Sequence, residues 1–198
     1  MSKHPAALHA SVVALLTSWD APDPAQDTLR HAVLSFVIAR PDACMRACVP
    51  GHITASTLVL DAAGTHALLT LHPRFGRWLQ LGGHCEPTDT DIHAAALREA
   101  TEESGINGLT VDLELAALHV HPVTCSLGQP TRHLDMQFLM HAPPGAEISC
   151  SDESLDLRWW PMDRLPHDMD FGLTQLANAA RRRGDGGRGR SARHTSDE

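Results

Sequence analysis

The chain has 198 residues, a length typical of one domain with extensions, and its apolar share of 42% allows a sizeable core. An excess of 24 acidic over 16 basic residues gives a formal charge of -8, which argues against broad nucleic-acid or membrane-surface binding by the folded body. No stretch reaches the roughly 18 apolar residues of a membrane span, so no membrane partner is expected. Five cysteines follow no secretory segment, and we therefore expect free thiols in a reducing cytoplasm.

The first 45 residues predict two helices joined by a proline-containing break. Residues 5–19 carry apolar side chains at helical spacing. Asp23 followed by Pro24 is typical of an N-cap and a first helical position, so a second helix is expected from 24 to about 39. Residues 1–45 are therefore interpreted as an N-terminal helical extension. Three roles are open for it: capping a site, forming a homodimer contact or completing the core.

From about residue 52 the spacing changes to that of strands. Ile53 to Leu60 is rich in β-branched residues, and the turn from Asp61 to Gly64 predicts a hairpin with 66–71. A short strand over 78–81 is expected to lead into two glycines. The remaining elements are predicted in this order: a helix over 91–104 ending at Gly105, strands near 110–123, 133–141 and 157–160, and a last helix over 171–181.

The C-terminal residues differ in composition from the rest of the chain. Residues 182–198 are rich in arginine and glycine and hold no large apolar side chain. Such a segment cannot bury enough surface to order itself, so a disordered tail is expected there, after a main domain over 46–181.

The chemistry is concentrated in the glycine pair Gly82-Gly83 and the helix after it. Glu99, Glu102 and Glu103 are spaced i, i+3, i+4, which brings three carboxylates to one stripe of a helix. Like charges this close repel, and a hard divalent ion with oxygen ligands is the usual way to make them favourable. A merely solvated helix face would carry mixed signs, but this stripe has no lysine to pair with its acids.

This segment resembles the Nudix hydrolase motif G-x5-E-x7-R-E-U-x-E-E-x-G-U, where U is a bulky apolar residue. The second half matches from Arg98-Glu99 to Gly105-Ile106, with a small Ala100 at one U position. The first half departs, because the five-residue gap after Gly83 ends on Asp89 instead of Glu and the next gap is one residue longer. The resemblance extends over about 50–181 and implies an α/β fold, the Nudix α/β/α sandwich with a mixed sheet, preceded here by the two helices.

The resemblance also implies an activity. Nudix hydrolases use Mg²⁺ or Mn²⁺ to hydrolyse a diphosphate linkage, so a small-molecule nucleoside diphosphate derivative is the expected substrate. By position, Glu99, Glu102 and Glu103 are the implied metal ligands, with the Gly83 carbonyl as a further one. The general base is open between the helix residues Glu102 and Glu103 and the loop residue Glu153. Arg98 is expected to orient a carboxylate by a bidentate hydrogen bond.

Other polar and aromatic residues carry weaker predictions. His133 and Asp135 share one face of a strand and face either a substrate cleft or a structural hydrogen bond. His84 directly follows the glycines, and it is expected to contact either phosphate or an acidic residue behind the metal ligands. Most of the 14 histidines are expected to be surface or hydrogen-bonded core residues. Aromatic side chains for stacking a base, though more often found in cores, are Phe75, Trp78 and Trp159.

Two other functions compete with hydrolysis of a nucleotide derivative. One is a Nudix-fold sensor that binds a nucleotide metabolite without turnover, against which the complete carboxylate cluster argues. The other is an RNA 5′-end pyrophosphohydrolase. The acidic body makes nucleic acid an improbable partner, while the Arg/Gly tail keeps that function open.

Overall fold

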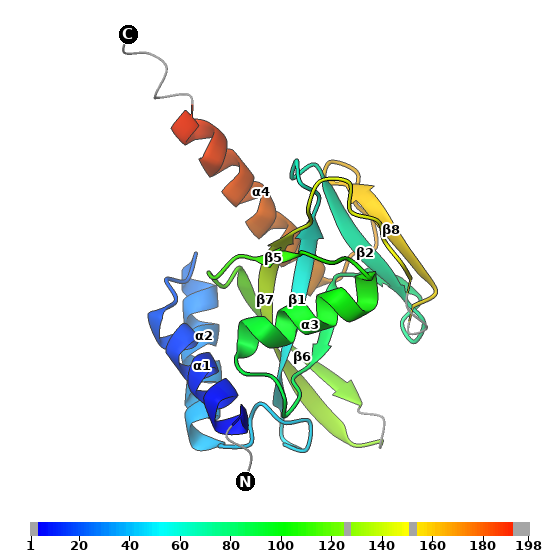
Figure 1. The fold of residues 1–198 in the computed structure, drawn as a ribbon. Helices are drawn as coiled ribbons and strands as arrows, with labels where there is room; N and C mark the ends of the chain where they lie inside the picture. Colours follow the sequence, from blue (N-terminus) through cyan, green and yellow to red (C-terminus); the bar gives the residue numbers. More distant parts are fainter. Residues whose placement is uncertain (1–3, 125–127, 151–153, 192–198) are drawn as a thin grey trace.

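The computed structural model describes residues 4–124, 128–150 and 154–191, with the backbone alone over 185–191. Helices and strands follow the order expected from the sequence (Figure 1). They are α1 His4–Ser18, α2 Pro24–Ala39, β1 His52–Leu60, β2 His66–His72, β3 Arg77–Leu79, β4 Leu81–His84, α3 Ile92–Ser104, β5 Thr110–Val111, β6 Ala117–Thr124, β7 Pro130–His141, β8 Asp156–Pro161 and α4 Phe171–Ser191.

The strands form one mixed sheet, which confirms the α/β class. β1 and β7 run parallel at its centre, in register from His52 opposite His133 to Leu60 opposite His141. All the remaining strand pairs are antiparallel: β2 and β4 pair with β1, β5 and β6 pair with β7, and β3 and β8 pair with β2. The single strand expected over 78–81 is divided at Gln80, because β3 pairs with β2 whereas β4 crosses to pair with β1.

Helices cover both faces of this sheet. α3 lies across one face, α1 and α2 stand together beside it, and α4 starts behind the sheet (Figure 1). Alternate residues of β1 divide between the two layers: Ile53 and Ala55 belong to the core under α3, and Leu58 belongs to the core under α4. The sandwich therefore holds one hydrophobic core on each side of the sheet.

The N-terminal helices complete the core under α3, one of the three roles left open by the sequence. Asp23 caps α2 as predicted, with Pro24 in the first helical turn. The buried side chain of Gln26 donates to the Leu118 carbonyl at 3.0 Å and accepts from the Leu118 N–H at 2.7 Å, so α2 is fixed to β6. The indole of Trp19 donates to the Leu115 carbonyl at 2.8 Å.

The last helix is longer than the sequence predicted. α4 continues to Ser191, where a disordered tail was expected from residue 182. Its arginines replace apolar anchors by hydrogen bonds: Arg181 donates to the Met162 carbonyl at 2.7 Å, and Arg183 donates to Asp112 at 3.0 Å. No helix in the described ranges is both long enough and apolar enough to cross a membrane.

Candidate active site

The glycine pair on β4 brings the backbone of that strand into close contact with its neighbours. Gly82 has φ +139°, and a Cβ at this position would lie 2.4 Å from the Ala55 carbonyl oxygen of β1. At Gly83 a Cβ would lie 2.7 Å from Oε2 of Glu99. A side chain at Gly82 would therefore have to displace the backbone of β1, whereas one at Gly83 would have to displace the Glu99 carboxylate.

α3 begins and ends at the residues that the sequence indicated. Asp91 is the N-cap and accepts from the Ala94 N–H at 2.9 Å, while Gly105 ends the helix in the left-handed conformation with φ +69°. These caps fix the rotation and length of the helix. The carboxylates of Glu99 and Glu103 consequently face the β4 glycines.

Arg98 is the centre of an ion-pair network at the start of α3. Its guanidinium forms a bidentate pair with Asp89, with Nε donating to Oδ1 at 3.0 Å and an Nη donating to Oδ2 at 3.1 Å. It also donates to the His84 carbonyl at 2.9 Å and to Glu99 and Glu102 at 3.0 Å each. Burial opposes the charge of Arg98, but Asp89 and Glu99 together raise its pKa.

Asp89 is thus a structural anchor, although its place in the motif was uncertain from the sequence. Only 5% of the residue is exposed. Besides the two bonds from Arg98, its Oδ2 accepts from the Glu86 N–H at 2.7 Å. The loop with one extra residue is therefore closed by a carboxylate shorter than the usual Glu, which still reaches the arginine.

The three helix carboxylates differ in their surroundings. The Glu99 side chain is mostly buried against Gly83, whereas 61% of the Glu102 side chain is exposed. Glu103 accepts from the Gly82 N–H at 2.9 Å, so it too is directed at the glycine pair. Glu99 and Glu103 thus lie at the glycine pair, whereas Glu102 is placed by its bond from Arg98. Carboxylate oxygens of this kind suit a hard divalent cation such as Mg²⁺ or Mn²⁺. Among the described residues, these three carboxylates do not yet form a cluster of ligand atoms within 4.8 Å of one another. The loop candidate for the general base, Glu153, lies outside the described residues.

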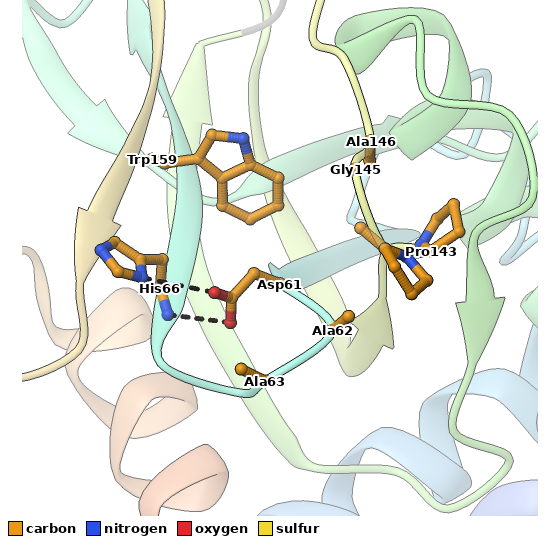
Figure 2. A pocket seen from close by; sticks show the side chains of 10 residues that line it. Asp61, Ala62, Ala63, His66, Pro143, Gly145, Ala146 and Trp159 are labelled. Carbon is orange, nitrogen blue, oxygen red and sulfur yellow. Dashed lines mark hydrogen bonds and ion pairs between the residues drawn. The ribbon is translucent and has the colours of Figure 1, made fainter.

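The aromatic candidates do not gather around the carboxylates. Trp78 stacks edge-on against Trp160 at 5.3 Å, and Phe75 is exposed beside His72. Trp159 forms one wall of a cavity of about 520 Å³ between the turn after β1 and residues 142–146 (Figure 2). The residues that line this cavity include none of the predicted metal ligands. The chemistry is therefore not placed in this cavity.

The sheet face under α4 holds the polar residues Asp135 and His133 that the sequence placed on one face of a strand. Asp135 is buried and accepts from Thr54 Oγ1 at 2.9 Å and from Ser56 Oγ at 2.6 Å. These are the structural hydrogen bonds considered for it. His133, on the same strand, instead meets His52 and His84, which come from β1 and β4. These three histidines form a cluster that the expectation for most histidines did not include, because strand pairing brings them together.

Burial dominates the electrostatics of these rings. It lowers the pKa of His133 to about 3 and that of His84 to about 4, with neighbouring histidines adding to the effect. The pKa of His52 is lowered for the same main reason. All three imidazoles are therefore neutral at neutral pH. The spacing of these histidines along the chain does not predict the cluster, because its members lie on three separate strands.

Comparison with known proteins identifies the family of this chain. Residues 50–180 match the family model described as NUDIX domain, so the chain belongs to the NUDIX family. A UDP-X diphosphatase matches with a TM-score of 0.52 at 15% identity, covering 88% of this chain and 90% of that chain. A Nudix hydrolase from M. smegmatis matches with a TM-score of 0.50 at 21% identity, covering 68% of this chain and 87% of that chain. The comparison with curated proteins found no match.

These findings confirm the resemblance stated from the sequence. The family model covers the sheet, α3 and α4 up to residue 180, and it leaves out α1 and α2. The chain is therefore an enzyme of the Nudix type.

Proposed function

We propose that this enzyme hydrolyses the diphosphate linkage of a small nucleoside diphosphate derivative and requires Mg²⁺ or Mn²⁺. The observation that carries the proposal is the close approach of the Glu99 carboxylate to Gly83. The carboxylate occupies the space where the Cβ of any other residue would lie. This close approach brings a carboxylate of α3 next to a half-buried backbone without a Cβ, which leaves room for a hard cation and an anionic substrate. Glu99, Glu102, Glu103 and the Gly83 carbonyl are the proposed ligands.

The residues of the chain have distinct roles in this proposal. A bound divalent ion supplies positive charge to the diphosphate and lowers the pKa of water. Arg98 positions Glu99 and Glu102 through its hydrogen bonds and is itself held by Asp89. A carboxylate accepts the proton of the attacking water, and the electrons of the broken phosphoanhydride bond leave with the departing phosphate.

The general base remains open between two helix residues and one loop residue. Glu102 and Glu103 are the helix candidates, and Glu153 is the loop candidate. Substitution of the base by glutamine should remove the acidic limb of the pH–rate profile, because that limb reports the protonation of the base. Substitution of a residue that is only a ligand should instead raise the concentration of ion needed for activity.

A substrate panel tests the proposed function. Nucleoside diphosphate derivatives, including UDP derivatives because one similar structure is a UDP-X diphosphatase, are incubated with Mg²⁺, with Mn²⁺ or with a chelator, and products are separated by chromatography. We expect turnover only with an ion. Glu102→Gln should lose at least about 10²-fold in kcat/KM, which exceeds most outer-shell effects. The matched control, Glu147→Gln, changes an exposed glutamate outside α3 and should keep full activity.

Two results would contradict the proposal. Full activity of Glu102→Gln would contradict the assignment of Glu102 as a metal ligand. Tight binding of nucleotide derivatives without turnover under any ion would favour the sensor instead.

A further inference from the structure

Three histidines meet on the sheet face opposite α3, away from the helix carboxylates. His52 begins β1, His133 lies directly opposite it on β7, and His84 ends β4 opposite Thr54. Because Thr54 is two residues from His52 along β1, the three side chains share one face of the sheet. Their ring centroids are 5.0–5.1 Å apart in every pair.

The geometry of the ring nitrogens is that of a ligand set. One nitrogen from each of the three histidines lies within 4.8 Å of those of the other two. In a tetrahedral zinc site, bonds of about 2.0–2.1 Å to nitrogen place neighbouring ligand atoms a little over 3 Å apart, so modest side-chain rotation would be enough to close this set on an ion.

His52 provides a second, independent observation. Only 1% of the residue is exposed, and its Nε2 has no hydrogen-bond partner among the described residues. Its Nδ1 lies 3.4 Å from the Cys48 carbonyl oxygen, a contact that favours the proton on Nδ1 and leaves a lone pair on Nε2. A buried acceptor without a donor is costly, and a bound cation would remove that cost.

We propose that His52, His84 and His133 form a binding site for one transition-metal ion of the Zn²⁺ class. Three neutral imidazoles suit Zn²⁺, Co²⁺, Ni²⁺ or Cu²⁺, whereas Mg²⁺ and Mn²⁺ prefer oxygen ligands. Three protein ligands leave a fourth position for water or another small ligand, as in open zinc sites. The site uses no carboxylate of α3, so it stands independently of the proposed hydrolytic function.

Burial supports this ligand set, because each ring is held neutral and a neutral ring needs to release no proton when it binds an ion. His121, on the adjoining strand β6, meets the His133 ring edge-on with centroids 5.2 Å apart and lies outside the set of three. Its ring packs against one of the proposed ligands and so limits the movement of that ligand.

The test is calorimetric titration of the full chain with Zn²⁺ in saturating Mg²⁺, so that the carboxylates of α3 are already occupied. We expect one Zn²⁺ per chain. His133→Gln and His52→Gln should each weaken that binding by at least about 10²-fold. The matched control His31→Gln changes an exposed histidine on α2 and should bind Zn²⁺ as the wild type does. Glu102→Gln should also retain the zinc, which separates this site from the proposed active site.

A spectroscopic measurement keeps the proposal falsifiable if a histidine variant does not fold. Co²⁺ added to the wild-type chain in saturating Mg²⁺ should give the strong visible absorption of a tetrahedral ion, and added Zn²⁺ should displace it. Zinc binding that survives both histidine substitutions, a stoichiometry of zero, or only the weak spectrum of octahedral Co²⁺ would overturn the proposal.

Discussion

The pair between Asp89 and Arg98 is predicted to be the main anchor of the loop before α3, and Asp89→Asn tests this without changing the shape of the side chain. Both carboxylate oxygens accept hydrogen bonds: Oδ1 from Arg98 Nε, and Oδ2 from Arg98 and from the Glu86 N–H. In Asp89→Asn, the amide NH2 group would take the place of one of these oxygens. It would then face an N–H donor of Arg98 or Glu86 and could not accept its hydrogen bond. The variant also removes a charge that partners a mostly buried guanidinium.

The magnitude follows from burial and from the remaining partners. Breaking a buried ion pair costs about 3–5 kcal/mol when the other charge is left alone. Arg98 keeps Glu99 and Glu102, so we expect a lower value, about 2–3 kcal/mol of unfolding free energy. For a domain of this size, that corresponds to a fall in Tm of roughly 4–12 °C.

Urea unfolding followed by circular dichroism measures the effect as a shift of the midpoint at constant m-value. The control is Asp163→Asn, which removes the charge of an exposed pair with Arg164 and should cost less than about 1 kcal/mol. If both variants lose the same small amount of stability, the bidentate pair does not anchor the loop.

Three further predictions concern other parts of the fold. Gly82→Ala should cost more than about 3 kcal/mol of unfolding free energy or prevent folding, because the new Cβ would overlap the backbone of β1. The control Gly64→Ala, with φ +68° and open space around it, should cost about 1–2 kcal/mol in the same urea assay. Equal losses in the two variants would contradict the close approach of β1 to Gly82. Gln26→Ala should cost about 2–3 kcal/mol, since it leaves the buried N–H and carbonyl of Leu118 unpaired, and a wild-type midpoint would mean that α2 is not fixed to the sheet. The metal-free protein should lose stability as the pH falls from about 6.5 toward 3, because the pKa of His133 is lowered to about 3 and the unfolded state binds a proton there first. Urea midpoints across this range should show that slope, and His133→Gln should make it shallower.

Local chemistry allowed much of the site to be predicted from the sequence. Asp23 and Gly105 indicated helix ends by short-range capping, which depends on a few neighbouring residues. The spacing of Glu99, Glu102 and Glu103 predicted a common stripe, because helical periodicity is fixed by the backbone. Together with the glycine pair, these residues were enough to identify the family.

Long-range pairing decided what the sequence left open. Register between distant strands is set by the packing of whole sheet faces, and no local pattern encodes it. This is why the division of 78–81 between two partners emerged only in the folded chain. The bidentate contact of Asp89 and the extension of α4 likewise depend on arginine side chains that reach distant partners. The meeting of His52, His84 and His133 has the same origin, since each residue reads as an isolated polar position until three strands align.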